Sequence, residues 1–429
     1  MTVIGLDDTD SRTRGMCTTY VANRVATRLR DDGANVERLL LVRLNPAVEF
    51  KTRGNAALAI HTDADPETAE RVAREELDKA AEVDDPRTNP GLVVAPDAPE
   101  TVPDAVANFA RDALREILPV ERATELADEA GYRHAGWKNS QGIVGALAAV
   151  GAWAAFDDWT YEHISYREPD RWGTDRHLDY DSLFDAADEQ YPKAWDTVDR
   201  VEGEAVCVPH TPCPILYGIR GDDAEACRNL AGAVDSEPVH DSALFVTNQG
   251  TDAHLAPGEL GSLAEDRAYR VAGTVATEPE TRRGGHVFFE LAEDADGDGK
   301  SPQSIRCAAF EPTKRFRDRV RALRENDRLT VCGEVSDGTL KLEKFAVREL
   351  DETELTTPIC PDCERTMKSA GRNQGYRCRD CGTSAPGKVE SPVARDLEIG
   401  WYEVPPCARR HVAKPLVRGG FDAPTHHER

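Results

Sequence analysis

The sequence contains no run of about 18 apolar residues, so no segment is predicted to cross a membrane as a helix. It also begins without a basic and apolar leader, because Met1 runs directly into the strand-like residues 2–6. We therefore expect a cytoplasmic protein. Its 429 residues, 40% of them hydrophobic, are enough to build about three or four domains, each with its own core.

Lysine is scarce. Only 11 of the 53 basic residues are Lys and 42 are Arg, whereas 78 Asp and Glu bring the net charge to −25. An acidic, Lys-poor surface suits a cytoplasm of molar salt, where the Debye length falls to about 3 Å. The composition therefore predicts a halophilic archaeal source. The same screening allows an acidic chain to bind nucleic acid, since only local basic patches then matter.

The chain has 11 Cys, but their spacing along the sequence is not that of a disulfide-bonded protein. Two Cys-x-x-Cys pairs, Cys360 with Cys363 and Cys378 with Cys381, instead predict one tetrahedral zinc site. A redox pair is the alternative, but such a pair usually stands alone before a helix. Four thiolates leave no open position, so the zinc is expected to be structural. Basic and aromatic residues that suit RNA contact surround the site: Arg365, Lys368, Arg372, Tyr376, Arg377 and Arg379.

Short strands separated by Gly turns dominate residues 269–350. A helix is expected over 313–325, between the third and fourth strand, which is the OB-fold arrangement. The predicted strands are 269–277, 286–291, 304–310, 328–335 and 340–347. A purely structural barrel is the alternative. Residues 311–328 carry seven basic against four acidic side chains, which favours RNA binding.

An α/β pattern fills the first 266 residues. A buried strand over 2–6 leads into Asp7, Asp8 and Asp10, and a helix capped by Thr18 or Thr19 is expected over 17–31. Carboxylates at the end of a buried strand suit Mg²⁺ beside phosphates, and a solvated turn is the alternative. Further strands are expected at 36–44, 56–61, 91–95, 214–219 and 241–247, and helices at 66–83, 102–117 and 222–233.

A Gly-rich segment, residues 136–145, interrupts a helical stretch at 121–153. Backbone amides at such a helix start can hold phosphates, and a nearby lysine adds charge. The segment is not a Walker motif. Close helix packing is the equal alternative. The candidate phosphate-binding residues are Gly136, Lys138, Asn139, Ser140 and Gly142.

Several blocks together resemble the archaeal tRNA-isoleucine 2-agmatinylcytidine synthetases over the whole chain. They are Ile4–Ser11, Gly15–Tyr20, His210–Pro214, Gly218–Gly221, Gly284–Val287, Tyr402–Pro406 and Ala408–His411. The resemblance implies a multidomain α+β fold. Its expected parts are a kinase-like α/β domain (1–60 and 137–197), a ferredoxin-like domain (61–136 and 198–266), an OB-fold β-barrel (267–350), and a zinc ribbon with the C-terminal tail (355–429).

The resemblance also implies a reaction. ATP phosphorylates the C2 oxygen of the wobble cytidine in an isoleucine tRNA with a CAU anticodon, and agmatine displaces that phosphate. AMP and two phosphates remain, and the modified tRNA reads AUA rather than AUG. The implied cofactors are ATP, Mg²⁺ and Zn²⁺. Neither a membrane nor an obligate protein partner is expected.

By position, Asp7, Asp8 and Asp10 match the family's acidic metal-binding block, and Thr18 matches its phosphorylatable threonine. Residues 136–145 match its phosphate loop, but Gln141 replaces a basic residue, for which Lys138 is a possible substitute. We expect the Pro-rich turn 209–214, with His210, to form one wall of the agmatine site, because its backbone presents carbonyls to a cation. The expected tRNA contacts are Arg315, Arg319, Arg409 and Arg410.

A non-enzymatic RNA-binding protein is the competing interpretation, with the barrel and ribbon as its active parts. A lack of ATP consumption, with or without tRNA and agmatine, would favour it. An ATP-dependent RNA enzyme that uses another amine or another base is a third possibility.

Overall fold

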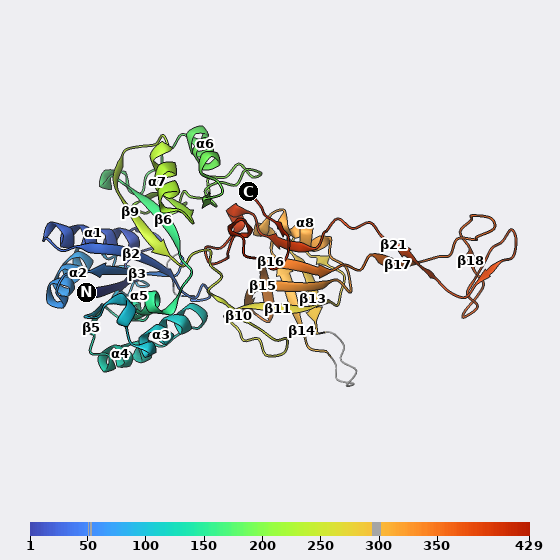
Figure 1. The fold of residues 1–429 in the computed structure, drawn as a ribbon, viewed down its shortest axis with the longest axis horizontal. Coiled ribbons are helices and arrows are strands. Elements are labelled where there is room, and N and C mark those ends of the chain that lie inside the picture. The colour runs from blue at the N-terminus through green and yellow to red at the C-terminus, as the bar shows by residue number, and fades with distance from the viewer. Residues whose placement is uncertain (50, 52–53, 294–301) are drawn as a thin grey trace.

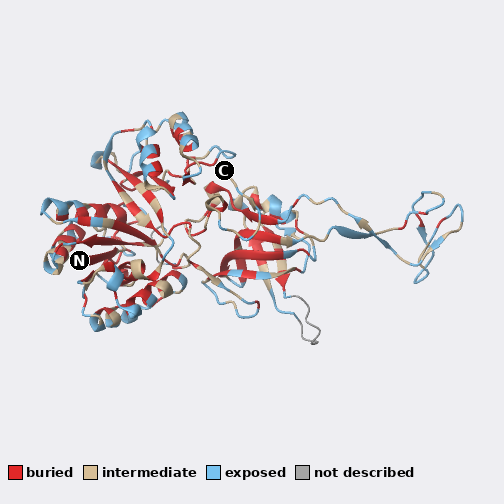
Figure 2. Cartoon of the chain, in the orientation of Figure 1, coloured by how far each residue is buried: buried red, intermediate tan, exposed pale blue. Residues whose placement is uncertain are grey.

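The computed structural model describes residues 1–429 except 50, 52–53 and 294–301. Three parts follow one another along the long axis: an α/β half, a β-barrel and a projecting ribbon (Figure 1). Buried residues follow the strands of the two larger sheets, whereas the ribbon is largely exposed (Figure 2). No helix among the described residues has the length and apolar character needed to span a bilayer.

One mixed sheet organises the α/β half, in the order β5-β4-β1-β3-β2-β9-β6-β8-β7. Its strands are β1 (Thr2–Asp7), β2 (Val36–Arg43), β3 (Ala56–Thr62), β4 (Gly91–Ala95), β5 (Arg133–Gly136), β6 (Thr160–Arg167), β7 (Ala194–Trp195), β8 (Ile215–Gly221) and β9 (Val239–Thr247). Strand β1 lies between β3 and β4 and is antiparallel to both. Because β1 is an interior strand that ends at Asp7, the acidic residues that follow it lie at one end of the sheet, between β3 and β4.

Helices cover both faces of this sheet. α1 (Thr18–Asp31) and α2 (Pro66–Ala80) share one core, and α3 (Asp104–Arg115), α4 (Val120–Glu129) and α5 (Gly142–Ala155) share the core on the other face. α6 (Tyr180–Gln190) and α7 (Ala224–Ala233) pack near β8. Helix α5 contains only apolar residues and glycine and is buried on nearly every side. Such a helix belongs in the centre of a domain.

The sheet has a seam where β2 meets β9. These strands pair in parallel at Leu40–Val246 and Leu41–Thr247. Residues 2–136 supply every strand on one side of the seam, and residues 160–247 supply those on the other. This grouping is contiguous and does not follow the expected division into 1–60 with 137–197 and 61–136 with 198–266. The physical reason is that β4 pairs directly with β1.

The OB-type barrel is confirmed. Its strands are β11 (Ala268–Val275), β13 (Val287–Ala292), β14 (Ser304–Ala309), β15 (Arg328–Ser336) and β16 (Thr339–Glu349), with β10 (Leu255–Pro257) and β12 (Glu280–Thr281) beside them. The basic helix is shorter than the expected 313–325. α8 covers Phe316–Arg321, after a 3-10 turn at Glu311–Thr313 and a left-handed Lys314 at φ 52°.

The chain leaves the barrel for the ribbon and then returns. A stalk of β17 (Thr353–Thr356) and β21 (Val389–Pro392) carries β18 (Lys368–Ser369), β19 (Tyr376–Arg377) and β20 (Ser384–Ala385). Afterwards β22 (Gly400–Glu403) pairs with β16, and β23 (Thr425–His426) pairs with β22. The tail grouped with the ribbon in the expected unit 355–429 is therefore built into the barrel.

Candidate active site and zinc ribbon

The end of β1 and the residues that follow it form a turn, called here the acidic turn, which consists of residues 7–10. The Asp8 N–H donates to Asp7 Oδ1 at 2.7 Å, and Asp8 adopts the left-handed φ of 56°. The backbone N–H of Asn89 donates to Asp8 Oδ2 at 2.8 Å. These bonds hold the carboxylates in fixed positions above the sheet.

Burial makes the acidic turn electrostatically costly. It raises the pKa of Asp7 well above its usual range, and the neighbouring Asp8 and Asp10 raise it further. Burial also raises the pKa of Asp8 to about 7, with a smaller contribution from Asp10, against the lowering effect of its Asn89 hydrogen bonds and of Lys138. Carboxylate oxygens are the donors that a divalent cation such as Mg²⁺ prefers, and Asp7, Asp8 and Asp10 line one cavity.

Thr18 lies beside this turn as the first residue of α1. The cap position is Cys17, which makes no side-chain cap hydrogen bond, so the expected cap at Thr18 or Thr19 was wrong. The Thr18 hydroxyl instead accepts a hydrogen bond from the Thr9 hydroxyl at 3.0 Å. Since Thr9 belongs to the acidic turn, the contact fixes Thr18 relative to the carboxylates.

The Gly-rich segment folds against the same turn. Lys138 and Ser140 have positive φ values of 57° and 65°. The Lys138 ammonium donates to the carbonyls of Asp85 at 2.5 Å and Thr88 at 2.7 Å. The Gly142 N–H donates to Asn89 O at 2.9 Å. The segment therefore belongs to one hydrogen-bonded unit with the loop that holds Asp8.

The amides at the start of α5 are mostly committed within the protein. Besides Gly142, the N–H of Ile143 donates to Ser140 O and that of Gln141 to the Asn139 side chain. The glycines serve close packing: a Cβ on Gly145 would lie 1.9 Å from Asp7 Oδ2, and one on Gly142 would lie 2.4 Å from the Gly91 nitrogen. This geometry favours the helix-packing alternative for these glycines, while Lys138 remains the charged group nearest Asp8 in this segment.

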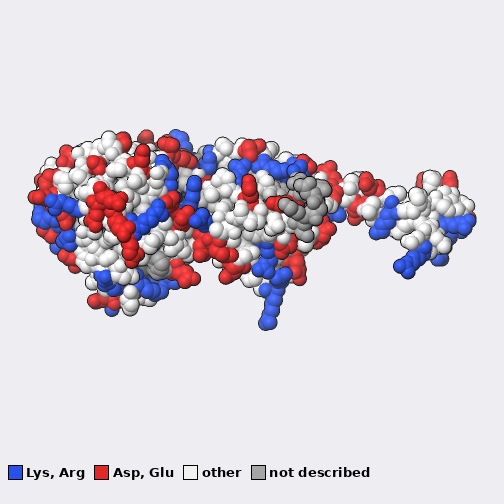
Figure 3. All heavy atoms as spheres, turned by 90° about the horizontal axis from the view of Figure 1, so that it is seen from below, with Lys and Arg blue, Asp and Glu red and all other residues white. Residues whose placement is uncertain are grey.

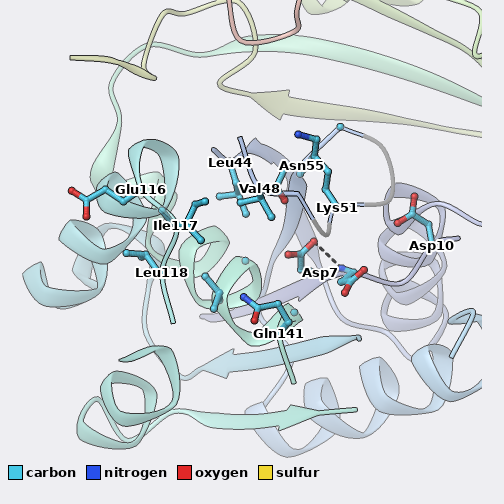
Figure 4. Close-up of a pocket in the computed structure, with 17 residues that line it drawn as sticks. Asp7, Asp10, Leu44, Val48, Lys51, Asn55, Glu116, Ile117, Leu118 and Gln141 are labelled. Atoms are coloured by element: carbon cyan, nitrogen blue, oxygen red, sulfur yellow. Dashed lines mark hydrogen bonds between the residues drawn. The ribbon is translucent and has the colours of Figure 1, made fainter. Parts of the chain in front are cut away.

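A small cavity of about 60 Å³ opens over the acidic turn (Figure 4). Around it lie Asp7 at the end of β1, Asp10 in the turn that follows, Lys51 and Asn55 before β3, and Gln141 at the cap of α5. Apolar side chains complete its wall: Leu44, Val48, Ile117 and Leu118. It joins carboxylates, an ammonium and amides at one place.

A second, larger cavity of about 360 Å³ adjoins it and shares Asp10. Thr18 lies on its wall. So does the predicted turn at residues 209–214, with His210 itself exposed and Cys213 buried. The structure thus brings Asp10, Thr18 and His210 to one cavity. The sequence analysis had assigned these three residues to different parts of one site.

Sequence reasoning missed the polar floor of this cavity. Glu162 lies between Arg43 and Arg220, with N–O distances of 3.8 and 3.6 Å, and Gln249 donates to it. Burial lowers the pKa of Arg43 to about 10. The neighbouring Arg220, together with burial, holds the pKa of His411 well below its usual range, so this imidazole is neutral. Arg220 and His411 lie within the blocks Gly218–Gly221 and Ala408–His411, which resemble the family, and this resemblance was the one indication in the sequence that they are functional.

Three of the arginines expected to contact tRNA form ion pairs within the protein. Arg315 pairs with Asp199 at 3.2 Å and Glu428 at 2.6 Å. Arg409 is buried against Asp196 and Glu403, and Arg410 pairs with Glu334 and Glu343. These ion pairs join the barrel, the tail and the α/β half. Arg319 differs, since it is exposed and lies over the Tyr402 ring at 5.7 Å.

The ribbon cysteines meet as predicted. Ligand atoms of Cys360, Cys363, Cys378 and Cys381 all lie within 4.8 Å of one another. Tetrahedral zinc at about 2.3 Å from each sulfur fits such a cluster. Apart from Met367, little apolar side chain is buried in the ribbon, so we expect metal binding to supply most of its stability. Figure 3 shows Lys and Arg atoms prominent on the ribbon surface.

Three family models match this chain. They are described as "TiaS TCKD domain" at residues 3–139, "TiaS FLD domain" at residues 140–254 and "TiaS C-terminal zinc ribbon domain" at residues 357–397. The junction of the first two at 139/140 agrees with a contiguous division of the α/β half rather than a discontinuous one.

Full-length relatives carry one description, that of an isoleucine-tRNA "2-agmatinylcytidine synthetase TiaS". The chain is 56% identical to the protein of that description from Haloquadratum walsbyi, covering 100% of both chains. It is 44% identical to the one from Methanosarcina mazei, covering 97% of both.

Solved structures agree with the sequence relatives. A crystal structure of TiaS in complex with an isoleucine tRNA and ATP matches with a TM-score of 0.89 and 41% identity, covering 100% of this chain and 99% of that one. A complex of TiaS with an isoleucine tRNA, AMPCPP and agmatine matches at 0.86 and 39%, with the same coverage.

Proposed function

The chain belongs to the tRNA-isoleucine 2-agmatinylcytidine synthetase family, and from that membership we propose that it uses ATP to join agmatine to the wobble cytidine of an isoleucine tRNA with a CAU anticodon. The modified tRNA would read AUA rather than AUG. The relatives' complexes with an isoleucine tRNA, ATP and agmatine support these substrates. We place the reaction in the cytoplasm.

One observation carries the proposal: Asp10 borders both the small cavity over the carboxylates and the larger cavity that contains Thr18. A cytosine C2 carbonyl has no leaving group, and phosphorylation of its oxygen supplies one. The phosphoryl donor and the base must therefore meet. Two adjoining cavities, one acidic and one large enough for a pyrimidine, suit that requirement.

We assign Asp7, Asp8 and Asp10 to a Mg²⁺ ion that would neutralise the ATP phosphates. Phosphoryl transfer depends on alignment and charge neutralisation more than on covalent help from the protein. Thr18 is held by Thr9 of the same turn and would receive or face the γ-phosphate. Lys138, fixed by the carbonyls of Asp85 and Thr88, partly offsets the charge of Asp8 and so keeps the turn compact.

The amine would enter through the larger cavity, with the turn at 209–214 as one wall. The primary amine of agmatine must be neutral to displace the phosphate. The floor carries two cations, Arg43 and Arg220, against the one carboxylate of Glu162, and this excess of positive charge disfavours a protonated amine at that depth. His210 is exposed at the rim of this cavity, where it can contact agmatine as it enters.

We assign tRNA binding to Arg319 and to the basic residues of the ribbon, because their side chains are exposed. Arg372, Arg377 and Arg379 lie on the ribbon beyond the stalk, where a long RNA arm can reach them. Phosphate contacts of this kind orient the RNA without reading its sequence.

Mass spectrometry of tRNA nucleosides tests the proposal. Purified protein, isoleucine tRNA with a CAU anticodon, ATP and agmatine should yield one agmatine-bearing cytidine per tRNA, and omission of ATP or agmatine should abolish it. Thr18→Ala should be folded but inactive, whereas Phe184→Leu, on α6, should be active. A folded protein that binds tRNA but neither consumes ATP nor alters the nucleoside would be a binding protein only.

A further inference from the structure

The outer surface of the barrel carries an aromatic cluster that the proposed reaction does not use. Along β13, Val287, Phe289 and Leu291 point into the barrel core, so the alternating Phe288 faces outward and is half-buried. On the paired strand β14, Ala308 lies opposite Phe288. Phe310 follows directly after β14.

These side chains form one platform, defined here as His286, Phe288 and Phe310 with Arg282 and Arg306. The Phe288 and Phe310 ring centroids are 6.1 Å apart, and those of His286 and Phe310 are 5.3 Å apart. The guanidinium of Arg282 lies 4.8 Å from the Phe288 centroid and that of Arg306 lies 5.8 Å from it. Aromatic faces and planar cations are thus interleaved on one surface.

The local charge departs from that of the chain, whose net charge is −25. Among the described residues, no acidic side chain forms an ion pair with Arg306 or Arg283, and Arg306 donates to the Thr339 hydroxyl. The nearby carboxylates are accounted for: Glu280 pairs with Arg282, Glu311 with Arg317 and Asp318 with Arg321, while Glu290 lies opposite Arg306 in the strand register.

The backbone holds the platform in place. Gly284 and Gly285, at φ 91° and 83°, make the turn between β12 and β13, a conformation that favours glycine. His286 Nδ1 accepts the Glu311 N–H at 2.9 Å, which fixes the ring. The block Gly284–Val287, prominent in the sequence, therefore has a structural purpose that the catalytic cavities do not explain.

We propose that this platform stacks unpaired nucleotides of the tRNA substrate, at a site separate from the catalytic cavities. The proposal rests on the proposed function for its ligand. Bases stack on aromatic side chains regardless of sequence, and flanking arginines meet the backbone phosphates. This surface of an OB-fold, around its second and third strands, is also where such barrels bind oligonucleotides.

Phe288→Leu tests stacking, because leucine keeps apolar bulk but removes the aromatic face. We expect tRNA affinity to fall about tenfold, and Phe288→Trp to retain it. Phe184→Leu is the matched control, since Arg200 lies 4.8 Å from the Phe184 centroid, as Arg282 does from Phe288. Thermal unfolding confirms that each variant is folded. Unchanged affinity in Phe288→Leu, or an equal loss in Phe288→Trp, would overturn the proposal.

A competition experiment separates stacking from phosphate contact and from a protein-binding role. A short single-stranded RNA should displace labelled tRNA from the wild type but only weakly from the Phe288→Leu form, and duplex RNA of equal length should distinguish them little. Equal competition by single-stranded RNA in both forms would overturn the platform. If the wild type makes no agmatinylcytidine yet shows this difference, the proposed function fails and the platform stands.

Discussion

Asp7, Asp8 and Asp10 are each only partly exposed, unlike the side chains of a fully solvated turn. Burial and mutual repulsion raise the pKa of Asp8 to about 7 in the absence of a cation. Raised pKa values on carboxyl groups that line a cavity support the role proposed for this turn, and a variant that removes one charge tests it.

Asp8→Asn should abolish product formation while preserving the fold. The amide keeps the shape and can still accept the Asn89 N–H, but it removes one metal-binding charge. We expect a rate loss of at least about 100-fold with little change in unfolding temperature. Product formation and thermal unfolding are measured on the same preparation. Asp84→Asn, at an exposed pair with Arg14, is the control and should be fully active. Full activity in folded Asp8→Asn would place the chemistry elsewhere.

His61 tests a different effect of burial. It has no exposed surface, and burial, with a smaller effect from Arg38, lowers its pKa to about 3. The unfolded chain binds a proton at this residue below about pH 6.5, whereas the folded chain does so only near pH 3, so stability falls as the pH drops between these values.

His61→Leu should therefore flatten the acid limb of the stability curve. At pH 5 and constant salt, the wild type should have lost about 2 kcal/mol more than the variant, relative to pH 7. The pKa values of the buried His254 and the partly buried His163 are also lowered, to about 4, so these residues will leave part of the pH dependence of stability in place. Denaturant unfolding at several pH values measures this. An unchanged slope would mean that His61 reaches water more easily than its position suggests.

Sequence could identify the acidic turn and Thr18 because they form a compact block after a strand. Local patterns could not identify Arg43 and Glu162, which come from strands distant in the chain, and Arg220 was marked only by the resemblance of the block Gly218–Gly221. Polar residues alternating in a strand usually face solvent, and only the sheet order shows that these face a cavity.

Among the elements, long periodic helices and the barrel strands were predictable. β4 was placed at its observed bounds, and α1 began within one residue of expectation. Strand β5 was missed because its four residues interrupt an Ala-rich helical stretch, and β6 because its sequence mixes polar and aromatic residues. Helix α8 is short because Lys314 adopts a positive φ just before it.

The ribbon should depend on zinc and act independently of the ATP site. Cys378→Ser removes one of four ligands, so we expect loss of bound zinc and weaker tRNA binding with unchanged ATP binding. Zinc content, tRNA titration and nucleotide titration provide the three measurements. Cys227→Ser, a buried thiol in α7 outside the ribbon, should keep its zinc. An equal loss of ATP binding in Cys378→Ser would contradict the separation of roles.

At the scale of the whole molecule, the tail unites the parts. Arg418 reaches Asp158 and Asp222 of the α/β half, while β22 extends the barrel sheet and His411 borders the larger cavity. Local sequence patterns do not reveal such pairings, because each joins residues far apart in the chain. For the same reason, the sequence did not show that Arg409 and Arg410 form ion pairs within the protein.

Arg409 and Arg319 separate these two roles. Arg409→Met would leave Asp196 and Glu403 buried without their cation, which should cost about 3–5 kcal/mol of stability. Arg319→Met, at an exposed position, should change stability by less than about 0.5 kcal/mol but weaken tRNA binding and reduce its salt dependence by about one phosphate contact. Chemical denaturation and tRNA titration across salt concentrations give both quantities. If Arg409→Met were as stable as the wild type and its tRNA affinity depended less on salt, Arg409 would be an RNA-binding residue. The reason is that removal of a side chain whose ion pairs hold the domains together must lower the stability.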